Sequence, residues 1–347
     1  MSEGAHFELG MDRWDVAAEL KDKKGNRYYI TFSFIRSGAM TLHYRHGMAG
    51  LYDAKNDRYL HMTFAPVIFA KAAKHDLLKE ADNNPYESAR LKEAAERIEN
   101  DDYRNFLPLE EIPAVYRNQL FINHEKLHFN RTSQKEFLYS LLAPVSKKTV
   151  VSLKMEAIAN PAIFDSKKPL INQGKSQLQG YVFPSVRFEG VISKGKKKAR
   201  VTGRGYYSHV FGSPSPAWFK NYREIFIDMD SGGFLIIYAY INPDGAPLGH
   251  RAFLLEPDGS VRDVEQLALK QGGEWKSGLS FLEYPEKMEI DSNSIKGEVK
   301  ILSRKTEEHL TEGRGAHFFG PCGFEGKDGD GKGLNGGGFC RMIVPGQ

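Results

Sequence analysis

The sequence predicts an all-β protein of two domains, and three observations support this prediction. The chain has 347 residues, which is more than one average domain. Several segments alternate apolar and polar residues with a period of two, as half-buried strands do. Short turn signals rich in Gly, Asn, Asp and Pro separate these segments, which is typical of an antiparallel sandwich or barrel.

The first half opens with a predicted meander of strands. In the segment 27–36, which is RYYITFSFIR, alternate aromatic and aliphatic residues would share one face. The same alternation continues at 40–44, and a further strand is predicted at 58–64. We therefore expect a sheet with one apolar face.

A helical insertion is predicted at about 66–119. Leu91, Ala95 and Ile98 recur at helical spacing there, after a proline at position 85. The polar side of this helix is either a solvated face or part of a lid over the mouth of a barrel. The sequence leaves both open.

Strands resume after the insertion and continue to the end of the chain. The stiff connector at 213–216, which is SPSP, marks the predicted boundary between an N-terminal domain at 1–212 and a C-terminal domain at 217–347. The predicted strands on either side are 149–157, 181–193, 199–211, 224–229, 234–241 and 249–256.

Composition limits the class of protein. Hydrophobic residues are 41% and charged residues 27%, which is ordinary for a globular protein. The net charge of +4 is spread along the chain, and its one tight cluster, KGKKKAR at 194–200, falls at a predicted hairpin turn. We interpret that cluster as a solvated turn and expect no nucleic-acid partner.

Cysteine usage and hydropathy bear on the compartment. Cys322 and Cys340 are the only cysteines, so a disulfide framework is excluded, although one C-terminal disulfide is allowed. The first thirty residues contain no apolar signal segment, and no window is long and apolar enough to span a membrane. We expect a cytoplasmic protein without a membrane span.

Two stretches carry a family resemblance. The segment 153–176 and the motif GRGYYSHVFG at 203–212 resemble the lipocalin-like family of carotenoid 1,2-hydratases and AttH-type proteins, together with related Diels-Alderase-type cyclases. The resemblance implies two tandem lipocalin-like domains and an apolar substrate bound in or between them. It also implies hydratase or cyclase activity without a cofactor.

The motif matches the family signature only in part. Ser208 stands where the family pattern has an acid, and Tyr240 stands where the hydratases carry an Asp. Hydration of an alkene needs an acid that can protonate carbon, which a carboxyl group does far better than a phenol. The matching residues are Gly203, Gly205, Tyr206, His209 and Gly212, and the other departures are Val210 and Phe211.

Strand alternation suggests candidate site residues. In 199–211, Gly203, Gly205 and His209 share a face, where the glycines either leave room in a cavity or mark a bend. In the bend alternative, His209 is a hydrogen-bonded core residue. The candidate catalytic residues are His209, Tyr238 and Tyr240, and the candidate substrate-binding residues are Trp14, Tyr206, Tyr207, Phe211 and Phe234.

These residues favour a cofactor-free cyclase or isomerase acting on an apolar polyene or polyketide-derived molecule. A pericyclic closure needs a folded substrate, excluded water and one or two hydrogen-bond donors, which tyrosine and histidine provide. The alternatives are a carrier of a lipophilic ligand and a hydratase of an isoprenoid alkene.

One rival motif points to zinc. His124, Glu125 and His128 match H-E-x-x-H, which on a helix forms a zinc hydrolase site. The flanking residues favour extended or hairpin structure instead, so a zinc hydrolase is a remote alternative and we predict no metal. The glycine-rich run at 331–336 lacks the strand and helix of a dinucleotide site and predicts a hairpin loop.

Overall fold

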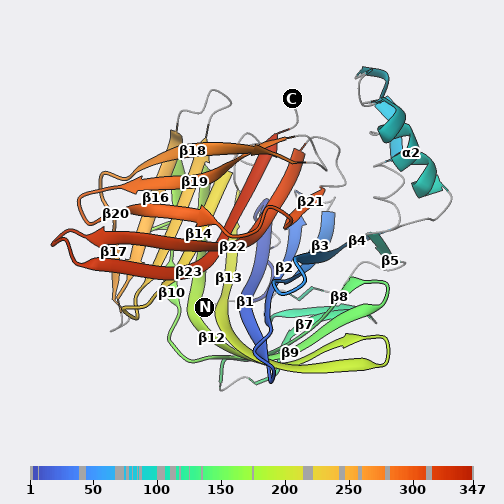
Figure 1. Cartoon of the computed structure of the whole chain (residues 1–347), viewed down its shortest axis with the longest axis horizontal. Coiled ribbons are helices and arrows are strands. Elements are labelled where there is room, and N and C mark those ends of the chain that lie inside the picture. Colours follow the sequence, from blue (N-terminus) through green and yellow to red (C-terminus); the bar gives the residue numbers. More distant parts are fainter. Residues whose placement is uncertain are drawn as a thin grey trace.

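A computed structural model shows two large sheets that curl against each other (Figure 1). The first contains strands from the N-terminal part of the chain, and the second contains strands from the C-terminal part. The structure describes residues 3–6, 8–38, 44–66, 74–75, 78–79, 81–83, 85, 88–99, 106–109, 115–116, 119–124, 126–133, 136–173, 176–213, 222–241, 247–256, 260–277, 282–309 and 315–345.

Among these residues the first sheet has thirteen strands, and its main path runs β5-β4-β3-β2-β1-β13-β12-β9-β8-β7-β6. Neighbours along this path are antiparallel except β4 and β5. The strands are β1 (Met11–Asp22), β2 (Arg27–Ser37), β3 (Tyr44–Asp53), β4 (Arg58–Pro66), β5 (Phe106–Leu109), β6 (Phe121–His124), β7 (Leu127–Arg131), β8 (Leu138–Ser146), β9 (Thr149–Ala157), β10 (Ala162–Phe164), β11 (Ile171–Gln173), β12 (Ser176–Lys194) and β13 (Lys197–Gly212).

The second sheet has ten strands within the described ranges, in the order β17-β16-β15-β14-β23-β22-β20-β19-β18, with β21 beside β22. The chain passes from one sheet to the other between Gly212 and Tyr222. The strands are β14 (Tyr222–Met229), β15 (Phe234–Ile241), β16 (Pro247–Leu255), β17 (Val261–Asp263), β18 (Ala268–Lys276), β19 (Glu283–Asp291), β20 (Ile295–Ile301), β21 (Glu307–His309), β22 (Gly315–Asp328) and β23 (Gly333–Pro345).

The predicted fold class is confirmed: the protein is built from two lipocalin-like β-domains, with a helical insertion in the first. Each sheet curls around its own apolar core, one including Trp14 and Phe32 and the other Tyr284 and Met288. A third core, which includes Tyr206, lies between the two sheets. The domain limits 1–212 and 217–347 remain a prediction.

The insertion contains helix α2 (Ser88–Glu99) and the short strand β5. In Figure 1, α2 lies at the edge of the molecule, away from the second sheet. Leu91 and Ala95 form its buried side. A lid role for this helix remains a prediction.

Several motifs fold as hairpins, as predicted. His124 ends β6 and Leu127 begins β7, and these two residues pair across the turn. The H-E-x-x-H motif is therefore not helical. The basic cluster at 194–200 contains the hairpin turn between β12 and β13. The glycine-rich run at 331–336 begins in the turn between β22 and β23. Among the described helices, none is long and apolar enough to cross a membrane.

The cysteines are free. Cys322 and Cys340 are both buried and unbonded to each other. Burial raises the pKa of the Cys340 thiol to about 12, so it stays protonated at neutral pH.

The signature glycines bring two strands close together, and both also line the cleft between the sheets, so the cavity and bend alternatives both remain open. A Cβ placed on Gly203 would lie 1.9 Å from the carbonyl oxygen of Glu19, and one on Gly205 would lie 1.9 Å from that of Ala17. Both distances are far shorter than van der Waals contact. The glycines therefore allow β1 and β13 to approach closely where the sheet curls.

We expect Gly205→Ala to lower the free energy of unfolding by about 1–3 kcal/mol, because β1 must move to admit the methyl group. Gly337→Ala is the matched control, since its Cβ would enter open space. Urea unfolding of both variants tests this. Equal urea midpoints for the two would contradict the close-approach interpretation.

Candidate functional site

Strands β1 and β13 pair along their length, and both faces of the pair are buried where Met11–Ala18 lies against 205–212, whereas Lys21 and Arg204 towards the other end are exposed. On one face, Trp14 and Tyr207 point into the core of the first sheet. On the other face, Ala17 and Tyr206 point toward the second sheet. The same strand pair therefore supplies residues to two separate environments.

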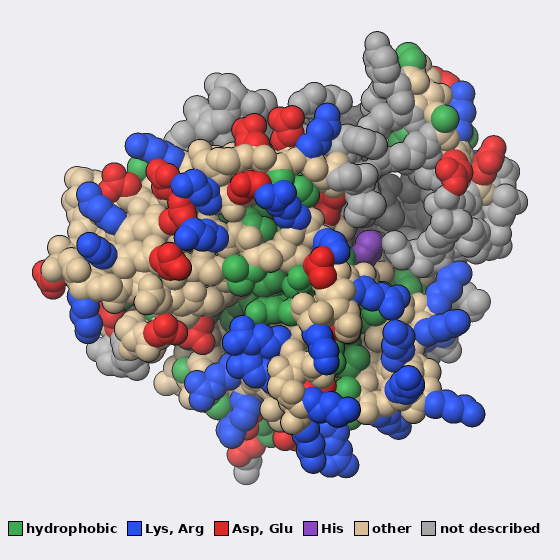
Figure 2. All heavy atoms as spheres, in the orientation of Figure 1, with side chains coloured by type: hydrophobic (Ala, Val, Ile, Leu, Met, Phe, Trp, Pro, Cys, Tyr) green, Lys and Arg blue, Asp and Glu red, His purple; other side chains and the backbone are tan. Residues whose placement is uncertain are grey.

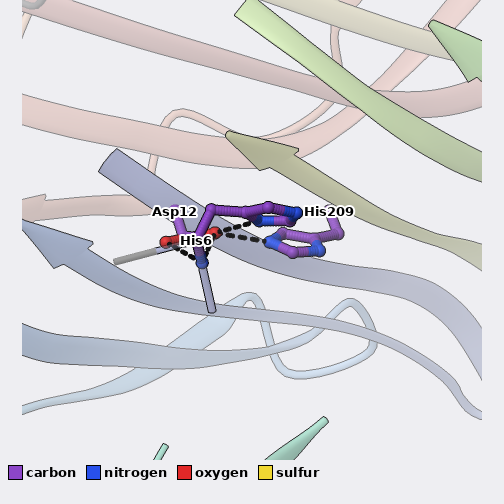
Figure 3. A group of neighbouring side chains, drawn as sticks. All are labelled: His6, Asp12 and His209. Atoms are coloured by element: carbon purple, nitrogen blue, oxygen red, sulfur yellow. Dashed lines mark hydrogen bonds and ion pairs between the residues drawn. The ribbon is translucent and has the colours of Figure 1, made fainter. Parts of the chain in front are cut away.

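A polar cluster lies on the inner face at the end of this strand pair (Figure 3). The Asp12 carboxylate lies 2.9 Å from His6 Nδ1 and 3.0 Å from His209 Nε2. Arg36 donates from Nε to the other carboxylate oxygen at 2.7 Å. Figure 3 shows both imidazole rings turned toward Asp12. The His209 ring also stacks on Trp14, with centroids 4.5 Å apart.

The charges of this cluster follow from burial and pairing. Burial opposes ionisation of Asp12, but hydrogen bonds with His209 and His6 and the charge of Arg36 outweigh it and hold the pKa of Asp12 well below its usual range. Burial lowers the pKa of His209 despite the neighbouring carboxylate. A neutral His209 that donates from Nε2 to Asp12 leaves Nδ1 as a buried acceptor without a partner among the described residues.

The same three side chains could in principle hold a metal ion. Ligand atoms of His6, Asp12 and His209 all lie within 4.8 Å of one another. However, the fully buried guanidinium of Arg36 already supplies the positive charge that balances Asp12. A cation at this position would meet that repulsion, so the prediction of no metal stands.

A second polar cluster joins the two sheets on the outer face. Arg341 donates to Asp15 at 2.7 Å and to Glu224 at 3.0 Å. Arg13 donates to Asp15 at 2.7 Å and also bonds Glu224. All four side chains are at most 4% exposed, and two positive charges balance two negative ones. The buried network is therefore neutral as a whole.

We expect Arg341→Ala to lower the free energy of unfolding by about 3–5 kcal/mol, because it leaves buried carboxylates without their partner. Arg262→Ala is the control, since Arg262 pairs with Glu256 at the surface and such pairs contribute about 1 kcal/mol or less. Urea unfolding measures both. Similar losses for the two would show that the buried network does not hold the sheets together.

A histidine between the sheets makes stability depend on pH. Burial first, and then the charge of His317, lower the pKa of His46 to about 4. The pKa of His46 in the folded protein is below its value of about 6.5 in the unfolded chain, so the unfolded chain binds the proton more readily. The contribution of a neutral His46 to the free energy of unfolding is therefore present above pH 6.5 and lost as pH falls toward 4.

We therefore expect the free energy of unfolding to fall between about pH 6.5 and 4, and His46→Gln to reduce this slope. Urea unfolding at half-unit pH steps measures it. His250→Gln is the control, since His250 is a partly buried histidine at another position, on β16. If the free energy of unfolding of His46→Gln falls as steeply with pH as that of the native protein, His46 is not the cause of the pH dependence.

A cleft with both aromatic and charged lining residues lies between the two sheets, with a volume of about 520 Å³. The Tyr206 ring stacks on Phe226 in its wall, with centroids 4.2 Å apart. Burial raises the pKa of Tyr206, and its hydroxyl has no partner among the described residues. The aromatic lining residues are Tyr29, Tyr206, Phe226, Phe234 and Phe339. The charged lining residues are Glu19, Lys21, Arg204, Asp228 and Asp230.

The sequence-predicted site residues divide between the two faces. The inner group surrounds the Asp12 cluster and consists of Trp14, Tyr207, His209 and Phe211. The outer group lies in the layer between the sheets and consists of Tyr206, Phe234 and Tyr238. Phe234 and Tyr238 share a face of β15, as predicted. Tyr240 lies on the same strand, and its side chain is outside the described residues. The roles of all these residues remain predictions.

Several residues of both environments were missed from sequence. Asp12 and Arg36 lie on neighbouring strands and pair directly in the β1–β2 register. Arg36 ends the predicted strand 27–36, but nothing in the sequence marked Asp12 as its partner. Nothing in the sequence marked Phe226 and Phe339 as cleft residues, except that both lie in apolar strands.

The fold is that of a tandem lipocalin-like protein, with an open cleft between its two sheets. The AttH-like family model matches residues 1–344, and the chain belongs to this family. No match was found among the curated proteins.

Three solved structures share the fold. A putative AttH from Nitrosomonas europaea aligns with a TM-score of 0.75 at 14% identity, covering 98% of this chain and 94% of that one. Kievitone hydratase from Nectria haematococca aligns with a TM-score of 0.69 at 8% identity, covering 99% and 93%. The protein CghA, solved with Sch210972, aligns with a TM-score of 0.51 at 9% identity, covering 99% and 93%.

Proposed function

We propose that this protein is a cofactor-free cyclase or isomerase that binds an apolar polyene or polyketide-derived molecule in the cleft between the sheets. The observation that carries the proposal is the aromatic lining of that cleft. Its volume is within the range of small-molecule sites, about 300–1,000 Å³. Aromatic walls suit an extended conjugated substrate, and the charged rim keeps the mouth solvated.

Tyr206 is the donor that we propose for a cyclisation, which requires a bound substrate to reach its buried hydroxyl. Its ring forms part of the cleft wall, and its raised pKa keeps the hydroxyl protonated at neutral pH. A hydrogen bond from a phenol to a substrate carbonyl would stabilise the electron density that develops there. Tyr238 packs close by, since both tyrosines contact the ring of Phe226.

The buried carboxylates are poor acids for hydration. Hydrogen bonds and neighbouring arginines hold the pKa values of Asp12 and Asp15 well below their usual range. Both groups therefore stay ionised at neutral pH and have no proton to give to carbon. This favours a reaction that needs no strong acid.

One cleft residue favours hydration as a second candidate. Asp228 lines the cleft, and partial desolvation raises the pKa of its carboxyl. A carboxyl group of raised pKa is a better proton donor near neutral pH. The fold shared with a protein named kievitone hydratase gives this alternative further support.

We expect Gly337→Phe to weaken binding of an apolar probe at least tenfold, because Gly337 lines the cleft and a side chain there would occupy it. The probe is a fluorescent conjugated C18 tetraene acid, titrated into the protein. Gly333→Phe is the matched control, since Gly333 lies on the same strand with open space around it and does not line the cleft. Equal binding by both variants would rule out the cleft as the ligand site.

Turnover distinguishes the candidate functions. A linear polyene with an activated double bond is incubated with the protein, and the product is analysed by mass spectrometry. An isomer of unchanged mass, formed faster than without protein and lost in Gly337→Phe, supports the cyclase. A product heavier by one water and absent with Asp228→Asn supports the hydratase instead. Binding without turnover indicates a carrier.

A further inference from the structure

Three hairpin turns of the first sheet meet at one end of the molecule. Strands β2, β1, β13, β12, β9 and β8 are consecutive in the sheet, so the turns that join them in pairs lie side by side. The register places Asp22 opposite Val201 and Lys194 opposite Thr149. The backbone N–H of Gly195 also donates to the carbonyl of Lys148 at 3.0 Å, so two of the turns touch.

This end of the molecule, called here the basic end, carries a dense positive charge. Figure 2 shows Lys and Arg side chains gathered over the lower part of the drawn face, where Figure 1 places the hairpin ends of the first sheet. All of these side chains are exposed: Lys21, Lys23, Lys24, Lys147, Lys148, Lys194, Lys196, Lys197, Lys198 and Arg200.

Few carboxylates offset this charge. Asp22 is engaged within its own turn by Asn26, and Glu19 lies within 3.5 Å of Lys21 and Arg27. The lysines of the other two turns make no ion pair with any described residue. The net charge of the whole chain is only +4, so the basic end is a local concentration of charge.

The basic end adjoins the mouth of the cleft. Lys21 lines the cleft and lies at the end of β1, next to the first turn. Arg204 also lines the cleft, on β13 shortly after the second turn. A negatively charged surface in contact with the turns would therefore lie beside the opening between the sheets.

We propose that the basic end docks on an anionic phospholipid membrane and places the cleft mouth at the lipid surface. Exposed lysines near such a surface are attracted to its negative potential. An apolar ligand concentrates in a bilayer, so docking would shorten its path to the cleft. The turn sequences at 22–26, 146–149 and 194–197 contain no aromatic residue to stack on unpaired bases, which disfavours single-stranded nucleic acid. The link to the cleft rests on the proposed function, whereas the docking itself does not.

Vesicle co-sedimentation tests the proposal with the full chain. We expect binding to vesicles of phosphatidylcholine with about 30% phosphatidylserine, little binding to phosphatidylcholine alone, and loss of binding at about 0.5 M salt, where charges are screened. The variant Lys148→Gln, Lys196→Gln, Lys197→Gln, Lys198→Gln should bind at least tenfold more weakly. The matched control is Lys270→Gln, Lys276→Gln, Lys327→Gln, Lys332→Gln, which removes the same charge from exposed positions of the second sheet.

Equal losses in the two variants, or no binding of the native protein to the anionic vesicles, would overturn the proposal. So would a 30-base-pair DNA duplex that binds more tightly than the vesicles and displaces them. Thermal unfolding of each variant confirms that it is folded, and the salt dependence of the native protein needs no variant. Because vesicle binding requires no turnover, its failure is distinct from a failure of the proposed cyclase activity.

Discussion

The burial of both faces of the β1–β13 pair, over Met11–Ala18 and the residues opposite, is the constraint on which the rest of the structure depends. In an antiparallel sheet that has one solvated face, alternate residues meet water and carry the polar groups. Here the second sheet covers the face that would otherwise be solvated, so Asp15 and Tyr206 are buried as deeply as Trp14. Every polar group on either face therefore needs a partner within the protein.

The two polar clusters meet this need in different ways. On the inner face, Asp12 is balanced by Arg36 from the adjacent strand, so the cluster is completed within the first sheet. On the outer face, Asp15 pairs with Arg13 of its own strand and with Arg341 of the second sheet. Both arginines also pair with Glu224 of the second sheet. Desolvation makes each of these charges unfavourable alone. The outer network can therefore form only when the two sheets are together, and it fixes their relative position.

The sequence was sufficient to predict the elements and the faces of individual strands. Alternation predicted that Phe234 and Tyr238 share a face, and turn residues predicted the hairpins that contain His124 and Lys196. These features depend on neighbours in sequence. The fold class followed from them together with the family resemblance of GRGYYSHVFG.

The division of the candidate site could not be predicted in the same way. A period of two shows that His209 and Tyr206 point in opposite directions, but not that both directions lead to buried environments. The partners that complete those environments are distant in sequence, since Asp15 and Arg341 are separated by 326 residues. Only the register of the sheets and their packing bring them together.

The separation of the two environments also limits where chemistry can occur. In the Asp12 cluster, the carboxylate pairs with Arg36, and His6 and His209 bond to the same carboxylate. The cleft has an opening, and Tyr206 lines it, although the Tyr206 hydroxyl itself is buried and has no partner among the described residues. A buried donor without a partner is costly unless a ligand satisfies it. Since His209 Nδ1 is also buried without a described partner, the lack of a partner does not by itself separate the two residues. Tyr206 differs in that it lines the cleft, which is why the proposed function assigns the contact with a bound molecule to Tyr206.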